Sequence, residues 1–467
     1  MRSSTSSSRQ GELFARSRTP AIAVDPSHPL LQLTHRLDWD QLLATVGKLR
    51  SRRLKSRAGR KPHLRPLVGS VLLMATRRLT LRDAEDQIRH YAPARYLCGL
   101  TECDWTPDFT TLHDFVTLIG EEGVRLINQF TVELAVKEKL ADPSVIVADT
   151  TAQEAVITHP NEMGLMTSFL TAVVAATQRV GRALPGAAAA LVKSLSTTLA
   201  TAKKKLRSYR LFAKTKEVKS EILTAMTQLV EGAQSRLSKA LESATVHKER
   251  LIKGGKVAWD KLGRLRATMS RLLPQIRSWL TTGRVAVGKI INVHIPGLYA
   301  IVRGKVGKKV EFGLRWGITR LRGGFILASL AKDRMDMQDA DYAVRAVDDH
   351  IALFGKAPRG YAYDRGGYSK ENVAALKNRG VKQIGLAPRG KARWTVAGRV
   401  KDRLVRERAQ VEGCIGAMKS PRYGFHRPAA RSTEMMGVCG QRAALGFNLN
   451  KLVREITRRD QLAASGA

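Results

Sequence analysis

Apolar residues recur at helical spacing through the first part of the chain. The expected helices cover residues 64–75, 81–89 and 107–128. Thr80 and Thr106 stand at the N-cap positions of the last two, where a hydroxyl can accept a hydrogen bond from the first turn. The pattern predicts a helical domain over residues 36–142. Residues 1–35 are rich in Ser, Arg and Pro without periodicity, and a flexible basic N-terminus is expected there.

The pattern changes after Pro143, where the β-branched run SVIVAD at 144–149 ends in a carboxylate. Such a run is typical of a buried central strand. Further strands are expected over 309–318, 325–330, 360–364 and 382–387. The first two of these are joined by a segment that contains Gly323 and Gly324, which indicates a hairpin. Helical spacing returns over 338–353, 369–379, 403–419 and 437–454.

This order of elements, an antiparallel beginning followed by strands that alternate with helices, matches a ribonuclease-H-like α/β fold. We therefore predict a catalytic domain of this type over residues 143–164 and 286–455, followed by a tail over 456–467. The residues between the two parts of this domain, 165–285, again have helical spacing. They are predicted to form a long helical insertion after the first core strand.

The charge of the chain indicates its partner. The 467 residues include 80 Lys and Arg against 40 Asp and Glu, a formal net charge of +40. A compact chain with this charge repels itself, so a polyanion such as nucleic acid is expected to bind it. Residues 160–290 hold 24 Lys and Arg against 7 Asp and Glu. The insertion is therefore interpreted either as a solvated helical element or as an arm that contacts DNA.

Other features narrow the class of protein. The first residues lack the apolar segment of a secretory signal, and no apolar run of about 20 residues is present. The four cysteines have no CxxC spacing, which disfavours a zinc ribbon or a disulfide framework. We expect a cytoplasmic protein that does not enter a membrane.

Three carboxylates occupy positions that the predicted fold makes meaningful. Asp149 ends the first strand, Asp364 ends the fourth, and Glu412 lies in the helix over 403–419. In a ribonuclease-H-like sheet the first and fourth strands are neighbours and this helix packs beside them, so the three side chains would converge. Two divalent cations, Mg²⁺ or Mn²⁺, would relieve their mutual repulsion, since these ions prefer oxygen ligands. Such a pair of ions can clamp the oxygens of a phosphoryl displacement.

The motifs around these carboxylates resemble those of bacterial insertion-sequence transposases of the DDE class, in the group with a Tyr-Arg-Glu-Lys signature. Arg408, Glu412 and Lys419 have the spacing of that signature, whereas Val405 stands at its Tyr position. Four further segments are similar to the family: DTTAQ at 149–153, DRGGY at 364–368, TPDFTTL at 106–112 and AALGFNL at 443–449. The second has one Gly more than the commoner Asp-Arg-Gly-Tyr. The insertion is not covered by the resemblance.

The resemblance implies cut-and-join DNA chemistry. Asp149, Asp364 and Glu412 would be catalytic and would hold two Mg²⁺ or Mn²⁺ ions. A phosphodiester at the element end would be hydrolysed before the freed 3′-hydroxyl attacked target DNA. The implied partners are double-stranded DNA, as terminal inverted repeats and target DNA, and a second copy of the chain in a homodimer. Two alternatives stay open: a non-catalytic or decayed transposase-derived DNA-binding protein, and a hydrolytic nuclease of the same fold.

Basic residues are expected to hold the DNA. Offsets of −4 and +7 place Arg408 and Lys419 on one helical face with Glu412, and the resemblance implies that they bind phosphates. Arg422 and His426 follow this helix and either contact DNA or form a capped turn. The basic run over 50–61 is interpreted as a DNA contact, with a tether as the alternative. Its DNA-binding residues are expected to be Arg52, Arg53, Lys55, Arg60 and Lys61.

Polar residues near the predicted site have weaker assignments. Thr150 and Gln153 either support the first aspartate or are ordinary strand residues. The acidic residues of 333–341 lack the register of a calcium loop, and we attribute them to the start of a helix, where negative charge is favoured. Asn448 is expected to be structural.

Overall fold

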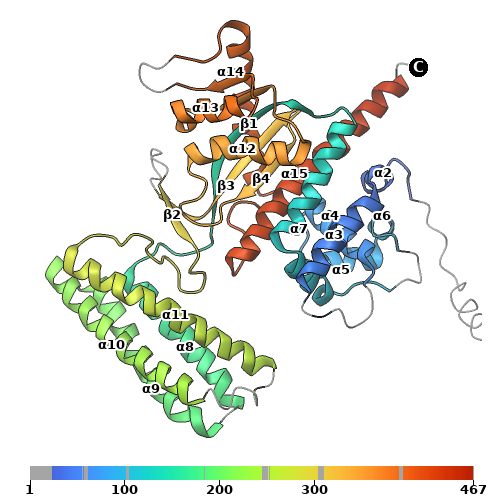
Figure 1. Cartoon of the computed structure of the whole chain (residues 1–467). Helices are drawn as coiled ribbons and strands as arrows, with labels where there is room; N and C mark the ends of the chain where they lie inside the picture. Colours follow the sequence, from blue (N-terminus) through green and yellow to red (C-terminus); the bar gives the residue numbers. More distant parts are fainter. Residues whose placement is uncertain are drawn as a thin grey trace, which may run out of the picture. The chain divides into compact units, whose positions relative to one another are not determined.

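The computed structural model describes most of the chain, in two compact units. The described residues are 24–54, 56, 62–100, 105–183, 185–244, 251, 253–302, 310–388 and 393–465. The sheet unit comprises Met1–Gln153, Arg315–Ala430 and Glu434–Ala467, and the bundle unit comprises Glu154–Leu314 and Arg431–Thr433. Figure 1 labels the elements of both units.

Helices form the N-terminal part of the sheet unit. They are α2 (Pro29–Arg36), α3 (Trp39–Arg53), α4 (Leu64–Arg77), α5 (Leu81–His90), α6 (Ala92–Leu97) and α7 (Phe109–Lys137). The Thr80 N-cap is confirmed, and it forms a reciprocal capping box with Asp83. The Thr106 N-cap is wrong, because Asp108 caps α7 by accepting a hydrogen bond from the backbone N–H of Thr111 at 2.7 Å. Helix also begins earlier than expected, at Pro29.

The sheet of the chain is mixed, and its strand pairing is close to that expected. Its strands are β1 (Asp142–Glu154), β2 (Tyr299–Val302), β3 (Val310–Arg322), β4 (Ile326–Leu330), β5 (Gly360–Tyr363) and β6 (Gln383–Leu386). The order is β2-β3-β1-β5-β6, with β4 also paired to β3. β5 is parallel to both β1 and β6, whereas β3 is antiparallel to β2 and β4. The chain is therefore an α/β protein with a mixed sheet.

The first strand is longer than the sequence prediction, whereas the predicted hairpin is present. β1 continues to Glu154, so Asp149 lies inside the strand and does not end it. Residues on both sides of Asp149 are buried, and the strand continues because its later residues Thr151 and Gln153 are buried too. The β3–β4 hairpin is confirmed, with its turn at Gly323 and Gly324, whose φ angles of +96° and +87° suit glycine.

Helices cover both faces of the sheet within the sheet unit (Figure 1). They are α12 (Asp339–Phe354), α13 (Lys370–Asn378), α14 (Gly398–Lys419) and α15 (Thr433–Ser465). Gly317 of β3 permits α12 to approach closely, since a Cβ there would lie 2.1 Å from Cζ of Tyr342. Gly440 permits α15 to approach Trp316 closely, since a Cβ added there would lie 2.2 Å from the indole. Successive residues of β3 thus face helices on opposite sides.

One apolar core runs through the sheet unit. It joins residues of α3, α4 and α7 to residues of β1, β5, α12 and α15, with Val46, Leu72, Ile146 and Leu449 among its most buried members. The N-terminal helices therefore share their core with the sheet, although the sequence pattern assigned them to a separate domain.

Within the described part of the bundle unit, four long helices occupy the segment expected to be a helical insertion. These are α8 (Glu162–Ala183), α9 (Pro185–Leu211), α10 (Lys216–Ala244) and α11 (Lys253–Thr282). Each packs on two or more of the others around an apolar cluster of its own, which includes Phe169, Leu195, Met226 and Leu272. This cluster lets the four helices form a compact body. None of the helices in the described ranges is both long and apolar enough to cross a bilayer.

Candidate active site and nucleic-acid contacts

Two of the predicted aspartates lie on neighbouring strands. β1 and β5 are parallel, and their register pairs Val145 with Gly360 and Val147 with Ala362. Continuing this register by two residues places Asp149 beside Asp364, which directly follows β5. Adjacent strands are about 4.8 Å apart. The structure therefore brings together two carboxylates that are more than 200 positions apart in the sequence.

Both aspartates belong to the face of the sheet that α14 covers. A Cβ added to Gly360 would lie 3.4 Å from Cγ2 of Val145 and 3.5 Å from Cδ2 of Leu404, a residue of α14. Strand side chains alternate between faces, so every second residue from Val145 and from Gly360 shares this side. Asp149 and Asp364 fall on that series, because Asp364 itself has an extended backbone. They face the helix that carries Glu412.

The environment of Asp364 disfavours its negative charge. Burial raises the pKa of this carboxyl above its ordinary value, and the nearby carboxylate of Asp339 raises it further. The backbone N–H of Gly366, which donates to Oδ1 at 2.8 Å, and the guanidinium of Arg408 oppose this shift in part. A cation at this place would be stabilised by the same crowding of carboxylates.

Asp339 is a third carboxylate beside Asp364, and sequence reasoning missed it. Thr150 donates a hydrogen bond from Oγ1 to Oδ1 of Asp339 at 2.5 Å. A Cβ added to Gly366 would lie 2.8 Å from Oδ2 of Asp339 and 2.9 Å from Oδ1 of Asp364. The sequence signal for Asp339 was only an acidic residue at a helix start, which the helix dipole explains equally well. Thr150, one of the two polar residues of β1 considered from the sequence, thus contacts a carboxylate of the candidate site.

Gln153, in contrast, has a structural role. Its side chain is fully buried, donates to the carbonyl of Met436 at 3.1 Å and accepts from Nε1 of Trp316 at 3.0 Å. These contacts agree with an ordinary buried strand residue and not with a residue that supports the first aspartate.

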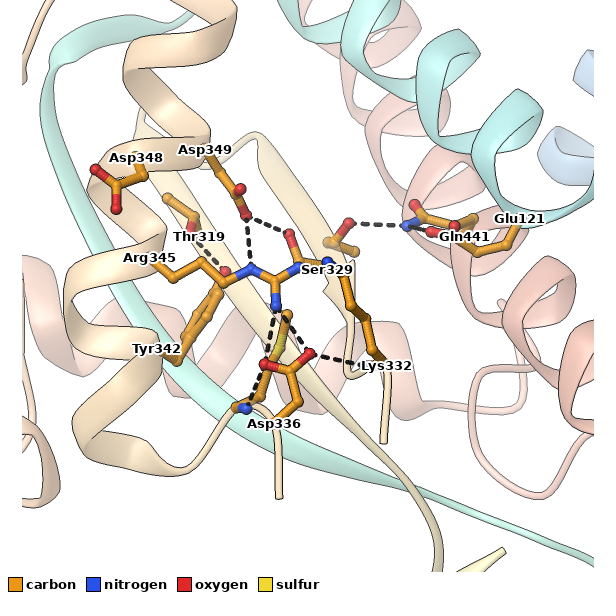
Figure 2. A network of polar contacts seen from close by, with 12 residues as sticks. Glu121, Thr319, Ser329, Lys332, Asp336, Tyr342, Arg345, Asp348, Asp349 and Gln441 are labelled. Atoms are coloured by element: carbon orange, nitrogen blue, oxygen red, sulfur yellow. Dashed lines mark hydrogen bonds and ion pairs between the residues drawn. The ribbon is translucent and has the colours of Figure 1, made fainter. Parts of the chain in front are cut away.

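A network of polar contacts fixes the segment that leads into α12 (Figure 2). Nη1 of Arg345 donates to both oxygens of Asp336, at 3.0 and 2.9 Å. Asp336 also accepts from the backbone N–H groups of Lys332 and Met337, at 2.7 and 2.9 Å. The acidic residue Asp336 thus closes a loop and is held by an arginine. This loop sets the position of Asp339, three residues later.

The side chain of Glu412 does not join those of Asp149 and Asp364 in one cluster. Its side chain is 63% exposed, and its Oε1 lies 3.5 Å from Nη2 of Arg408 on the preceding turn of α14. Among the residues that the structure describes, no three His, Cys, Asp or Glu side chains are grouped so that they could hold a metal ion. Asp149 and Asp364 fit a divalent cation by their chemistry, whereas Glu412 has to leave Arg408 to join them. Exposed pairs of this kind contribute only about 0.3–0.5 kcal/mol, so that change is small.

A buried ion pair anchors α14 to the sheet. The guanidinium of Arg320, on β3, is only 6% exposed and donates from Nη1 to Oε2 of Glu407 at 2.6 Å. Its Nη2 contacts the side chain of Gln410, one turn further along α14. Arg320 stands on the same face of β3 as Trp316. The pair fixes the helix on the face to which Asp149 and Asp364 belong.

The basic residues after α14 lie at the surface. Lys419 is the last residue of the helix, and the exposed side chains of Arg422 and His426 belong to the loop that follows. The guanidinium of Arg422 lies 5.7 Å from the ring of Tyr423. The side chains of Arg422 and His426 are therefore accessible to a large ligand such as DNA.

The comparison with known protein families concerns the N-terminal helices. Residues 20–118 match the model of a transposase domain (DUF772). The match supports a transposase family for this chain. No curated protein and no solved structure matches it.

The matched residues 20–118 include the basic run that was interpreted as a DNA contact. Arg53 donates from Nη1 to the carbonyls of Leu118 and Ile119, at 3.2 and 2.8 Å, and from Nη2 to Glu122 at 2.5 Å. These contacts favour a structural role for Arg53. Arg52 has a 69% exposed side chain and a longer contact of 3.5 Å with Glu122. Of the remaining expected residues, Lys55, Arg60 and Lys61 lie outside the described residues.

Proposed function

We propose that this chain is a DDE-class transposase that cuts and joins DNA at the ends of an insertion sequence. The observation that carries the proposal is the parallel register of β1 and β5, which supports a site built from Asp149 and Asp364. The match of residues 20–118 to a transposase domain independently supports a transposase, since these residues lie outside the two strands. The surplus of basic residues fits a DNA substrate.

The strand order supports a ribonuclease-H-like core. Read without β2, the order is β4-β3-β1-β5-β6, with the first strand central and its parallel partner β5 beside it. Counted along the chain without β2, the spatial order is third, second, first, fourth and fifth strand, and the first and fourth strands are neighbours, as the sequence prediction expected. In such a core, Asp149 inside β1 and Asp364 directly after β5 would both be within reach of one phosphate.

Asp149 and Asp364 would hold Mg²⁺ or Mn²⁺, and Glu412 would complete a second position after it leaves Arg408. The bound ions would neutralise the charge that develops on the phosphate in an in-line displacement. Asp339, which accepts a hydrogen bond from Thr150, would add negative charge beside Asp364 and so favour a bound cation. Arg408, once released from Glu412, would be available for a phosphate oxygen.

The remaining predicted contacts would hold the DNA duplex. Lys419 at the end of α14 and the exposed Arg422 and His426 beyond it would bind backbone phosphates near the cut. Arg52 would add a contact from the transposase domain. A homodimer would bring two element ends together. Such contacts bind without reading sequence, and they weaken as salt rises.

The test is a cleavage assay on DNA that carries the sequences flanking the gene. Strand cleavage and joining should require Mg²⁺ or Mn²⁺ and should be lost in Asp149→Asn, Asp364→Asn and Glu412→Gln, while affinity for the ends is kept. Asp348→Asn is a matched control, because Asp348 pairs with Arg379 on the surface of α12. Full activity in either aspartate variant would refute the proposed site.

The exposed position of Glu412 favours one alternative, a decayed transposase that binds DNA without cutting it. This alternative predicts end binding with no cleavage in the unchanged chain. A hydrolytic nuclease of the same fold predicts cleavage without joining. The same assay therefore separates the three cases.

A further inference from the structure

One corner of the bundle unit concentrates positive charge. It comprises residues 203–219, the end of α9, the connection and the start of α10, and we call it the basic corner. Glu217 is its one acidic residue. Its cations are Lys203, Lys204, Lys205, Arg207, Arg210, Lys214, Lys216 and Lys219. All of them are exposed except Lys205, which is half-buried.

These cations do not hold the bundle together. Within the described ranges, none of the eight forms an ion pair with a carboxylate. Other cations of the same unit do: Lys289 pairs with Glu162, and Arg277 lies 2.6 Å from Glu231. Like charges so close together repel, and helix i,i+4 pairs of one sign destabilise a helix slightly. The charge of the basic corner is therefore a net cost to the isolated chain, which an anionic partner would remove.

An exposed aromatic residue stands in the middle of this charge. Phe212, which follows α9, is 70% exposed, and Leu211, the last residue of α9, is 52% exposed. The backbone N–H groups of Phe212 and Ala213 both donate to the carbonyl of Ser208, at 2.9 and 3.2 Å, and the side chain of Ala213 is buried. The turn is thus anchored from both sides, and Phe212 is held out from the bundle.

We propose that the basic corner is a DNA-binding surface, in which Lys and Arg contact phosphates and Phe212 packs against a base at a distorted or unpaired step. The inference rests on the proposed function, because the ligand is the DNA on which the chain acts. Phosphate contacts need only accessible cations. An apolar side chain among them is the arrangement that inserts at a kinked step or stacks on an unpaired base. The element ends and their intermediates contain such steps when strands are cut.

The first test neutralises the charge at the basic corner. In the full chain, Lys204, Lys214 and Lys216 are replaced by Gln, and the control replaces Lys193, Lys239 and Lys256, which are exposed lysines elsewhere on the same bundle. Lys239 is about 35 Å from Lys216 along α10, at 1.5 Å per residue. The probe is a short mixed-sequence duplex, and its affinity is measured by fluorescence anisotropy over a range of salt. The slope of log K against log salt should fall by about two to three for the corner variant.

The control should keep the slope of the unchanged chain. Equal slopes for the corner variant and the unchanged chain would overturn the inference, and so would an equal fall in both variants, since the charge would then act without a defined place. If the unchanged chain does not bind the duplex, the proposed function fails as well. If the unchanged chain cuts and joins DNA and the corner variant has the same salt slope as the unchanged chain, the proposed function stands and the inference falls.

The second test concerns Phe212. Phe212→Ala should lower affinity for a duplex that carries an unpaired bulge by about fivefold or more, with the salt slope unchanged, because base stacking on an aromatic side chain is worth about 1 kcal/mol or more. Affinity for the fully paired duplex should change less. A Phe212-dependent binding to vesicles of phosphatidylglycerol, without an effect on the bulged duplex, would instead assign the surface to a membrane and overturn the inference.

Discussion

Removal of the charge of Glu407 should loosen α14 from the sheet. Glu407→Gln keeps the volume of the side chain and leaves the guanidinium of Arg320 buried without a carboxylate. Arg320 is 6% exposed and Glu407 is 14% exposed, so little solvent screens the change. Arg322 also lies 3.4 Å from Glu407 and would lose the same partner.

The expected size of the effect follows from this burial. Breaking a buried ion pair from one side destabilises a protein by about 3–5 kcal/mol, mainly because a charge stays behind without its partner. The Gln side chain and Gln410 can still accept hydrogen bonds from Arg320, so we expect the lower end, about 3 kcal/mol. The double replacement Arg320→Met with Glu407→Leu removes both charges and should stay within about 1 kcal/mol of the unchanged chain.

Hydrogen exchange of the α14 amides measures this effect locally. A local readout is preferable to a global melting curve, because two compact units can unfold separately. Glu407→Gln should speed exchange along α14, and the double replacement should restore it. An α14 that exchanges equally slowly in the single variant, or equally fast in both, would refute the claim that this pair anchors the helix.

Three further predictions concern stability. Asn448→Ala should lower the free energy of unfolding by about 2–4 kcal/mol in urea titrations, because the Asn448 side chain serves both the N–H and the C=O of Ile326, at 2.9 and 2.7 Å, inside the core. Burial lowers the pKa of His350 to about 4, whereas its value in the unfolded chain is about 6.5. Between these two pH values the unfolded chain binds a proton that the folded chain does not. The free energy of unfolding should therefore fall by up to about 3 kcal/mol from pH 6.5 to pH 4, and His350→Leu should abolish this loss. Arg53→Ala should destabilise the sheet unit by about 1–3 kcal/mol, measured by urea titration, and leave the salt slope of DNA binding unchanged.

Local signals predicted the elements around the site well. The helix expected over 369–379 is α13, and Ser369 is its N-cap, with Oγ accepting from the N–H of Asn372 at 3.0 Å. The two short runs that end near Asp149 and Asp364 proved to be neighbouring parallel strands. Such elements depend on residues within one turn or one strand, which a sequence pattern contains.

The missed features depend on contacts between distant segments. Asp339 joins the site through Thr150, 189 positions away, and its acidic character had a sufficient local explanation at the start of α12. Arg320 and Glu407 are each unremarkable in the sequence and gain their role only when β3 and α14 pack. Asp149 was assigned to a strand end because a carboxylate is a good local stop signal, although tertiary burial continues β1 for five more residues.

Mapping where a metal ion binds tests the proposed site at Asp149 and Asp364 most directly. Fe²⁺ with ascorbate generates hydroxyl radicals that cut the backbone beside a bound ion, and Mn²⁺ competes for the same position. We expect fragments that end near residues 149 and 364, that Mn²⁺ suppresses and that Asp149→Asn and Asp364→Asn abolish. Cuts confined to other parts of the chain, or cuts that persist in both variants, would contradict a site built from these two aspartates.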